Sequence, residues 1–132
     1  MSSVLSIAVS GMAAAERRLE VSARNVANVS TTGPLDAAPG DVRAAYAALR
    51  ADQTETAGGG TVVTVRRASP ATIAVSDPGS PFANADGLVA APNVDFATEA
   101  VEQLVARYSF AVNAAVIRAE NKMVKSLFDL KI

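Results

Sequence analysis

The chain has 132 residues, which suffice for one small domain that buries about two-thirds of the surface exposed by the unfolded chain. Half of the residues are hydrophobic, but alanine supplies many of them, Trp is absent, and four Phe and two Tyr provide the aromatic surface. Twelve basic and thirteen acidic residues give a formal net charge of −1, so no overall field attracts nucleic acid. We therefore expect closely packed helices, and no nucleic-acid partner.

The sequence pattern of residues 1–30 predicts a first long helix. A stripe of mostly apolar residues recurs at alternating steps of three and four, which is the spacing of one helix face. The stripe consists of Leu5, Ala8, Met12, Ala15, Leu19, Ser22, Val26 and Val29. A lone helix of this kind is marginal in water, so a second helix should cover the stripe.

Residues 93–132 predict that second helix. Pro92 marks its start, with Asn93 or Asp95 as the N-cap. The same three-and-four spacing places Val101, Val105, Tyr108, Val112, Ala115, Ala119 and Met123 on one face. Two such stripes at opposite ends predict a mainly α fold, in which the terminal helices pair as a coiled-coil-like hairpin.

Residues 31–92 predict a small middle lobe that contains β-structure. Val42, Tyr46 and Leu49 have helical spacing, which suggests a short helix within 41–52. Residues 61–65 and 71–75 are β-prone and should form a hairpin or small sheet, with Ser69-Pro70 in the connection. Turn signals occur at residues 38–40, 58–60, 77–81 and 84–87.

The composition argues against an enzyme. Without His or Cys, a His-based triad, a thiolate nucleophile and the usual zinc sites are excluded. The acidic residues are dispersed through turns and helix starts, and Gly58-Gly59-Gly60 lacks the Lys and hydroxyl residue of a phosphate-binding loop. We predict no catalytic, cofactor-binding or metal site.

The chain shows no sign of a membrane span or a classical secretion signal. Its first charged residues, Glu16, Arg17 and Arg18, follow the N-terminal apolar stretch instead of preceding it. No run of about eighteen consecutive apolar residues occurs. We expect neither a cleaved signal peptide nor a membrane-spanning segment.

Three motifs together resemble one known family. Asn25-Val26-Ala27-Asn28 ends the first helical segment, Pro92-Asn93-Val94 precedes the second, and Ser109-Phe110-Ala111-Val112-Asn113 lies within it. In this order, the motifs are similar to those of flagellar basal-body rod proteins, most closely the short proximal-rod ones. The middle of the chain does not match the family pattern.

The resemblance implies a structural subunit that polymerises through its terminal helices, transmits torque and encloses an export channel. Its partners would be copies of itself, other rod subunits and the flagellar export apparatus. It would be located in the periplasmic rod of the basal body, after export without a cleaved signal, and would need no cofactor. Two alternatives stay open: a helical adaptor, non-flagellar or regulatory, that binds one partner through the same helices, and an enzyme with carboxylate chemistry.

The residues expected at the assembly interface come from both helices and from the approach to the second. They are Leu5, Met12, Leu19, Asn25, Val26, Asn28, Pro92, Asn93, Val94, Val101, Val105, Tyr108, Val112, Asn113 and Met123. Among them, Asn25, Asn28 and Asn113 are expected to fix the register between subunits, because one polar residue in an apolar stripe can select a single register. The alternative role of Asn25 and Asn28 is helix capping.

Overall fold

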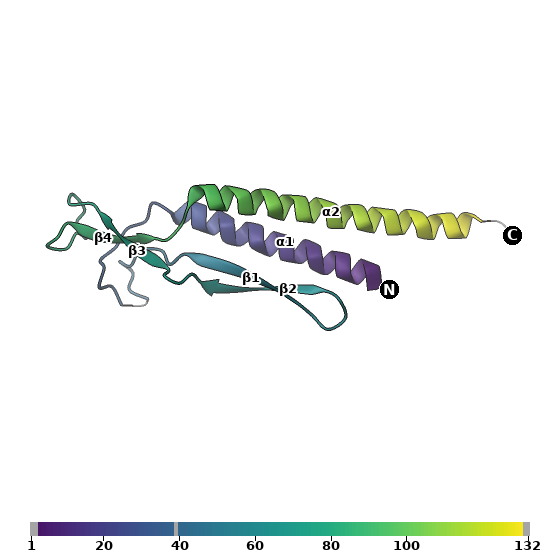
Figure 1. Ribbon diagram of the computed structural model, residues 1–132, viewed down its shortest axis with the longest axis horizontal. Coiled ribbons are helices and arrows are strands. Elements are labelled where there is room, and N and C mark those ends of the chain that lie inside the picture. The colour runs from purple at the N-terminus through teal and green to yellow at the C-terminus, as the bar shows by residue number, and fades with distance from the viewer. Residues whose placement is uncertain (1–2, 39, 131–132) are drawn as a thin grey trace. The chain divides into compact units, whose positions relative to one another are not determined.

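The computed structural model of the chain describes residues 3–38 and 40–130. Its elements are α1 (Ser3–Asn28), β1 (Leu49–Glu55), β2 (Thr61–Arg67), β3 (Thr72–Ser76), β4 (Leu88–Pro92) and α2 (Phe96–Asp129) (Figure 1). Two long terminal helices and a β-containing middle region confirm that part of the predicted fold class. Pro39 of the predicted turn and the predicted helix ends at 1–2 and 131–132 lie outside the described residues.

The chain forms two compact units. Unit 1 comprises residues 1–20, 51–64 and 101–132, and unit 2 comprises residues 21–50 and 65–100. Both helices and the strands β1 and β2 therefore contribute residues to each unit.

In unit 1, residues of α1 and α2 lie side by side and run antiparallel (Figure 1). Arg18 pairs with Glu102 at 2.7 Å, and about two turns away along α1 and three along α2, Gly11 lies against Asn113. Between the helices the buried side chains are small, with Ala15 and Ala106 almost completely buried. Small side chains let two helix backbones approach closely, which explains how an alanine-rich chain forms this pair.

The glycine run 58–60 turns the chain between β1 and β2, as predicted. The amide of Thr56 donates to the carbonyl of Gly60 at 2.8 Å, and the amide of Gly59 donates back to Thr56 at 3.1 Å. Gly58 and Gly59 have φ values of 106° and 85°, a region that L side chains rarely adopt. The turn therefore depends on glycine at these two positions.

Unit 2 is built around the antiparallel pair β3–β4, in which Val75 lies opposite Val89. Gly33 extends this pair through a bridge to Ala90, with its amide donating at 3.1 Å and its carbonyl accepting at 2.9 Å. A Cβ atom on Gly33 would lie 2.3 Å from the carbonyl oxygen of Arg43, so this bridge requires glycine. Val89 is completely buried and forms the centre of the unit.

The predicted strands at 61–65 and 71–75 are confirmed, but their predicted pairing with each other is wrong. β2 pairs with β1 and β3 pairs with β4, in two separate two-stranded sheets. The chain between them is held by Ala48, whose carbonyl accepts from Ala68 at 2.8 Å and whose amide donates to Ala71 at 3.1 Å. The connection between β2 and β3 is therefore bonded to Ala48, and β2 and β3 do not pair with each other.

The short helix predicted within 41–52 is also wrong, because this segment forms a turn followed by β1. The Asp41 carboxylate accepts from the backbone amide of Arg43 at 2.9 Å, which closes a local turn. Farther along, the amide of Leu49 donates to the Asn25 side chain at 2.9 Å. Five alanines and the spacing of Val42, Tyr46 and Leu49 gave the segment a helical appearance that these hydrogen bonds override.

Candidate assembly interface

The predicted stripe on α1 is covered, which confirms the predicted buried face of this helix. Ala8 and Ala15 in unit 1 and Ser22 in unit 2 are buried. The larger stripe residues Leu5, Met12, Leu19 and Val26 are half-buried. A face that is already covered inside the chain has limited apolar surface left for a neighbour.

The predicted stripe on α2 has the opposite environment, and the prediction that it covers α1 is wrong. Val101 is 58% exposed, Tyr108 73% and Met123 57%. Together with their exposed neighbours they form an apolar surface of α2, the outer stripe. The outer stripe consists of Val101, Leu104, Val105, Tyr108, Val112, Val116 and Met123.

The residues of α2 that do contact α1 belong to a second stripe, one position farther along the chain. Glu102 pairs with Arg18, Ala106 is buried, and Asn113 lies against Gly11. One residue corresponds to a rotation of about 100° around a helix. Small and polar residues at these positions therefore face α1, and the apolar residues of the outer stripe face outward.

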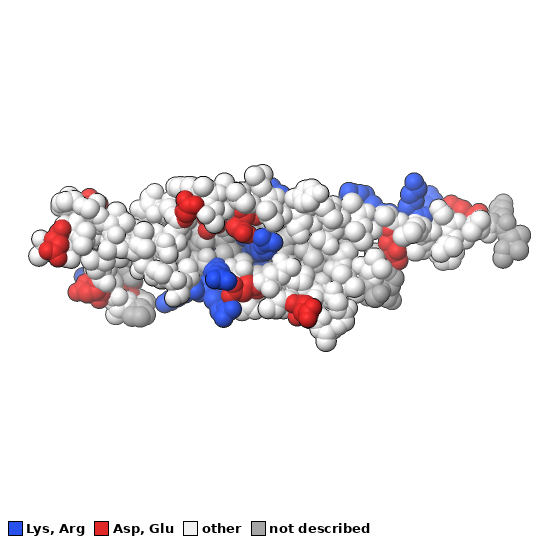
Figure 2. All heavy atoms as spheres, viewed as in Figure 1, with Lys and Arg blue, Asp and Glu red and all other residues white. Residues whose placement is uncertain are grey.

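The last turns of α2 have no cover in the described part of the chain. Every residue from 121 to 130 is exposed, and Phe128 reaches 85%. Lys122, Lys125 and Asp129 lie among these apolar residues, and Figure 2 shows blue and red groups separated by white surface over this half of α2. So much exposed apolar surface in one helix marks an interaction surface.

Asn25 lies in unit 2 and is only 3% exposed. Its Nδ2 donates to the carbonyl of Leu49 at 2.9 Å and to Glu99 Oε1 at 2.7 Å. Its Oδ1 accepts from the amide of Leu49 at 2.9 Å and from the hydroxyl of Tyr46 at 3.1 Å. An amide side chain offers two donor hydrogens and two acceptor lone pairs, so all four are used.

The environment of Tyr46 follows from the same cluster. Burial raises the pKa of the Tyr46 hydroxyl, and the negative charge of Glu99 adds to this increase, whereas the positive charge of Arg24 opposes it. The neutral phenol is the form that donates to Asn25. The cluster therefore favours the protonated form of Tyr46.

The other two asparagines bond to their own helices. Asn28 Nδ2 donates to the carbonyl of Arg24 at 2.8 Å, and Asn113 Nδ2 donates to that of Ser109 at 2.8 Å. Asn113 also fills the space beside Gly11, where an added Cβ atom would lie 2.6 Å from Asn113 Oδ1. Both asparagines are half-buried and keep acceptor capacity.

The segment Pro92-Asn93-Val94 connects β4 to α2 in unit 2. Pro92 is the last residue of β4 and is buried, and Val94 is half-buried. Asn93 is exposed and donates from Nδ2 to the carbonyl of Pro70 at 3.0 Å. These residues position the start of α2 inside the chain.

Of the two predicted N-caps of α2, Asp95 is the residue that caps. Its Oδ2 accepts from the amide of Thr98 at 2.9 Å and from the Thr98 hydroxyl at 2.6 Å. These hydrogen bonds hold the pKa of the Asp95 carboxyl below its usual value. α2 therefore begins with a charged cap at the positive end of its dipole.

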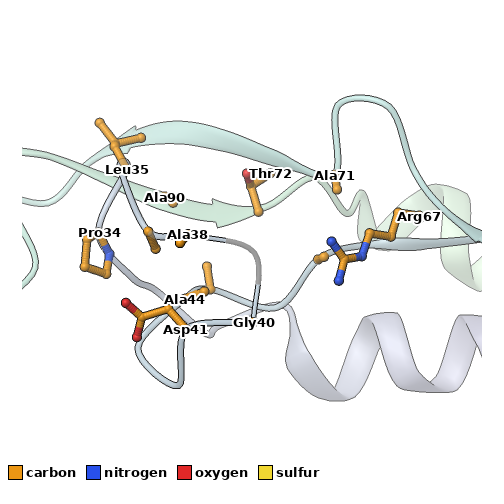
Figure 3. A pocket seen from close by; sticks show the side chains of 13 residues that line it. Pro34, Leu35, Ala38, Gly40, Asp41, Ala44, Arg67, Ala71, Thr72 and Ala90 are labelled. Carbon is orange, nitrogen blue, oxygen red and sulfur yellow. The ribbon is translucent and has the colours of Figure 1, made fainter.

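Unit 2 also contains an open cavity of about 340 Å³ (Figure 3). Its wall is largely alanine, and Asp41, which lines it, pairs with Arg43. Within residues 3–38 and 40–130, no group of three acidic residues could hold a metal ion, and no helix is long and apolar enough to cross a membrane. The cavity has the character of a packing defect, without the convergent polar groups of an active site.

Comparisons with known proteins agree with the motifs at both ends. The family model described as flagella basal body rod protein matches residues 5–34. The chain is 35% identical over 126 residues to the flagellar basal-body rod protein FlgC of Salmonella typhimurium, which covers 94% of this chain and 93% of the relative. The chain belongs to the FlgC family of flagellar basal-body rod proteins.

Other FlgC proteins are also similar to the chain over almost its whole length. The protein of Escherichia coli O6:H1 is 34% identical over 126 residues, covering 94% of this chain and 93% of the relative. The protein of Agrobacterium fabrum is 29% identical over 138 residues, covering 98% of this chain and 94% of the relative. The similarity thus extends through the middle region, where the sequence motifs showed no match.

Membership of the FlgC family establishes the function at a coarse level. The chain is a structural subunit of the flagellar basal-body rod, assembles with other rod subunits and is not an enzyme. Nothing in the comparisons supports the adaptor alternative.

Proposed function

We propose that the outer stripe of α2 is the main surface through which this rod subunit packs against its neighbours. The stripe is apolar, exposed and continuous over Val101 to Met123, whereas the matching stripe on α1 is covered inside the chain. Complete burial of a fully exposed side chain of this size contributes about 1.5–3 kcal/mol, and the stripe residues, 38% to 73% exposed in the subunit, gain roughly half of that each. The seven residues of the stripe therefore provide enough energy for assembly even after the cost of association.

The residues expected at the interface have different roles under this proposal. Val101, Val105, Tyr108, Val112 and Met123 contact neighbouring subunits directly. Leu5, Met12 and Leu19 support them from α1 within unit 1, Val26 packs in unit 2, and Pro92, Asn93 and Val94 set where α2 begins. Asn28 and Asn113 provide register-selecting polar contacts, whereas Asn25 acts inside the subunit because its four hydrogen bonds are made there.

Residues 1–30 and 93–132 would then be the assembly helices, which pair in a coiled-coil-like manner in the rod, and residues 31–92 would form an outer lobe. Many subunits arranged in this way would enclose an export channel and transmit torque as part of the proximal rod. The subunit would reach the periplasm through the flagellar export apparatus, without a cleaved signal. The names of the FlgC relatives and the exposed α2 surface support these assignments.

The test compares Val112→Asp with Ala111→Asp. Both positions are exposed, adjacent in α2 and about 100° apart around the helix; Val112 lies near the centre of the outer stripe, whereas Ala111, seven residues after Leu104, lies at its edge. Both variants should match the helix content of the unchanged chain by circular dichroism. Incorporation into basal bodies should fall by more than about tenfold for Val112→Asp, since an unpaired carboxylate in an apolar contact costs several kcal/mol.

Ala111→Asp, at the edge of the stripe, should incorporate several times better than Val112→Asp. Equal incorporation of the two variants would remove the outer stripe from the interface. A Val112→Asp chain that is unfolded before assembly would also contradict the proposal, because the structure leaves this side chain outside the core.

A further inference from the structure

We propose that the tip of the β1–β2 hairpin, residues 56–61, is a clasp that fixes the position of α1 in the subunit. Ser10 on α1 and Gly60 on the tip are its positioning residues. The clasp stays closed in the assembled rod, a statement that rests on the proposed function. All residues of the clasp belong to unit 1.

A hydrogen bond from the hairpin to the helix is the first observation. The backbone amide of Thr61, the first residue of β2, donates to Ser10 Oγ at 3.1 Å. The same hydroxyl donates to the carbonyl of Ile7 at 2.7 Å, which fixes the direction of its hydrogen. Ser10 Oγ therefore presents a lone pair to the hairpin, and the contact has a defined register.

The glycines of the tip are the second observation. A Cβ atom on Gly60 would lie 3.0 Å from Ser10 Oγ and 3.0 Å from Thr56 Oγ1, and one on Gly59 would lie 3.3 Å from Ile7 Cδ1. These distances are tighter than ordinary Cβ contacts. Glycine in the tip therefore lets the hairpin backbone approach α1 closely, in addition to forming the turn.

The position of the clasp on α1 is the third observation. Ser10 and Gly11 are consecutive, so their side-chain positions lie about 100° apart around the helix. Gly11 lies against Asn113 of α2, whereas Ser10 lies against the hairpin. Ala14, one turn after Ser10, is buried. α1 is thus held from two sides. It contains few large apolar residues and would be marginal alone, so the hairpin gives it a second stabilising contact.

A reversible covalent lock tests the clasp directly. The chain contains no cysteine, so Ser10→Cys with Gly60→Cys introduces the sole pair of thiols. An ideal Cβ atom on Gly60 lies 3.5 Å from Ser10 Cβ, at the short end of the 3.5–4.5 Å range of disulfides. The matched control is Val9→Cys with Gly60→Cys, because Val9 is exposed and about 100° around α1 from Ser10.

In the isolated chain, the Ser10→Cys/Gly60→Cys pair should oxidise at least about tenfold faster than the control pair. Ser10→Ala should raise the amide hydrogen-exchange rates of residues 7–14 by about fivefold, which corresponds to the loss of one ordinary hydrogen bond. Oxidising the cysteine pair should bring these rates to or below those of the unchanged chain, and reduction should raise them again. Equal oxidation of the two pairs, or unchanged exchange in Ser10→Ala, would overturn the clasp.

Incorporation into basal bodies tests whether the clasp stays closed. The oxidised Ser10→Cys/Gly60→Cys chain should incorporate as well as the unchanged chain. Failure of the oxidised chain, together with normal incorporation after reduction, would show that the clasp must open. Oxidation and exchange are measured on the isolated chain, so they succeed or fail independently of the outer-stripe test with Val112→Asp.

Discussion

Asn25 Nδ2 donates a 2.7 Å hydrogen bond to Glu99 Oε1 and thereby joins the end of α1 to the first turn of α2 within unit 2. The other three hydrogen bonds of the same amide go to Leu49 and Tyr46. A motif residue that was expected to contact another subunit therefore connects three segments of its own subunit. While these bonds persist, no polar atom of Asn25 is left for a neighbour.

We first predict that Asn25→Asp destabilises unit 2 by roughly 3 kcal/mol at neutral pH. The change removes both donors and places a second carboxylate beside Glu99, in a position with almost no exposure to water. Adding Glu99→Gln should recover part of the loss, since a glutamine amide can donate to the introduced carboxylate. Denaturant unfolding of the single and double variants measures both effects.

The control for this prediction is Asn28→Asp, three residues later in the same motif. Asn28 donates only to the carbonyl of Arg24 among the bonds described and is half-buried, so its replacement should cost less than about 1 kcal/mol. Equal losses at the two positions would mean that the Asn25 cluster does not hold the unit together.

A second prediction concerns the close contact between Gly11 and Asn113. In Gly11→Ala the new methyl group would meet Asn113 Oδ1 at 2.6 Å, so the side chain or the helix must shift, and we expect a loss of about 1–3 kcal/mol. Asn113→Ala opens the space, so Gly11→Ala should cost much less in that background. Thermal unfolding of the four chains in this cycle gives the coupling, and additive losses would speak against the contact.

The third prediction is a pH dependence that Tyr46 causes. Burial raises the pKa of Tyr46 above its unfolded value near 10, so the folded state holds this proton more tightly than the unfolded state. This contribution to stability is complete below pH about 10 and is lost as the pH rises through the folded pKa.

Tyr46→Phe isolates this effect. The free energy of unfolding of the unchanged chain should decrease more steeply above pH about 10 than that of Tyr46→Phe. At neutral pH the variant should be less stable by about 1 kcal/mol, because Asn25 loses one donor. Parallel pH profiles for the two chains would assign the alkaline loss to other groups.

The fourth prediction separates the two faces of the helix pair. Leu19 is half-buried and lines a cavity with Phe110 in unit 1, so Leu19→Asp should lower the stability of that unit by roughly 2–3 kcal/mol and abolish incorporation. Exchange protection of β3 and β4 in unit 2 should be unchanged. Val105→Asp, on the outer stripe, should leave unfolding of both units unaffected. Normal assembly of Leu19→Asp would remove this residue from the packing face.

The two terminal helices were predictable because their periodicity extends over many turns. The buried face of α1 was predicted correctly, since Ala8, Ala15 and Ser22 lie on its one apolar stripe. On α2 two stripes overlap, one with large and one with small residues, and periodicity favours the larger ones. Packing selected the small ones, because Ala106 and Gly11 allow close approach and Arg18 supplies a partner for Glu102.

The middle region was less predictable because distant residues determine it. β1 begins where Asn25 bonds Leu49, and the connection between the two sheets is held by Ala48. Local sequence patterns in an alanine-rich segment do not reveal hydrogen bonds to distant residues. Likewise, the motif around Asn25 indicated the family correctly, but its intramolecular role required the positions of Tyr46 and Glu99.

The measurement that tests the central claim most directly is cryo-electron microscopy of basal bodies from cells that make this chain. We predict density for the chain in the rod, with Val105, Tyr108 and Val112 of α2 buried against a neighbouring subunit. A rod in which these side chains face solvent, while α1 supplies the contacts between subunits, would contradict the claim.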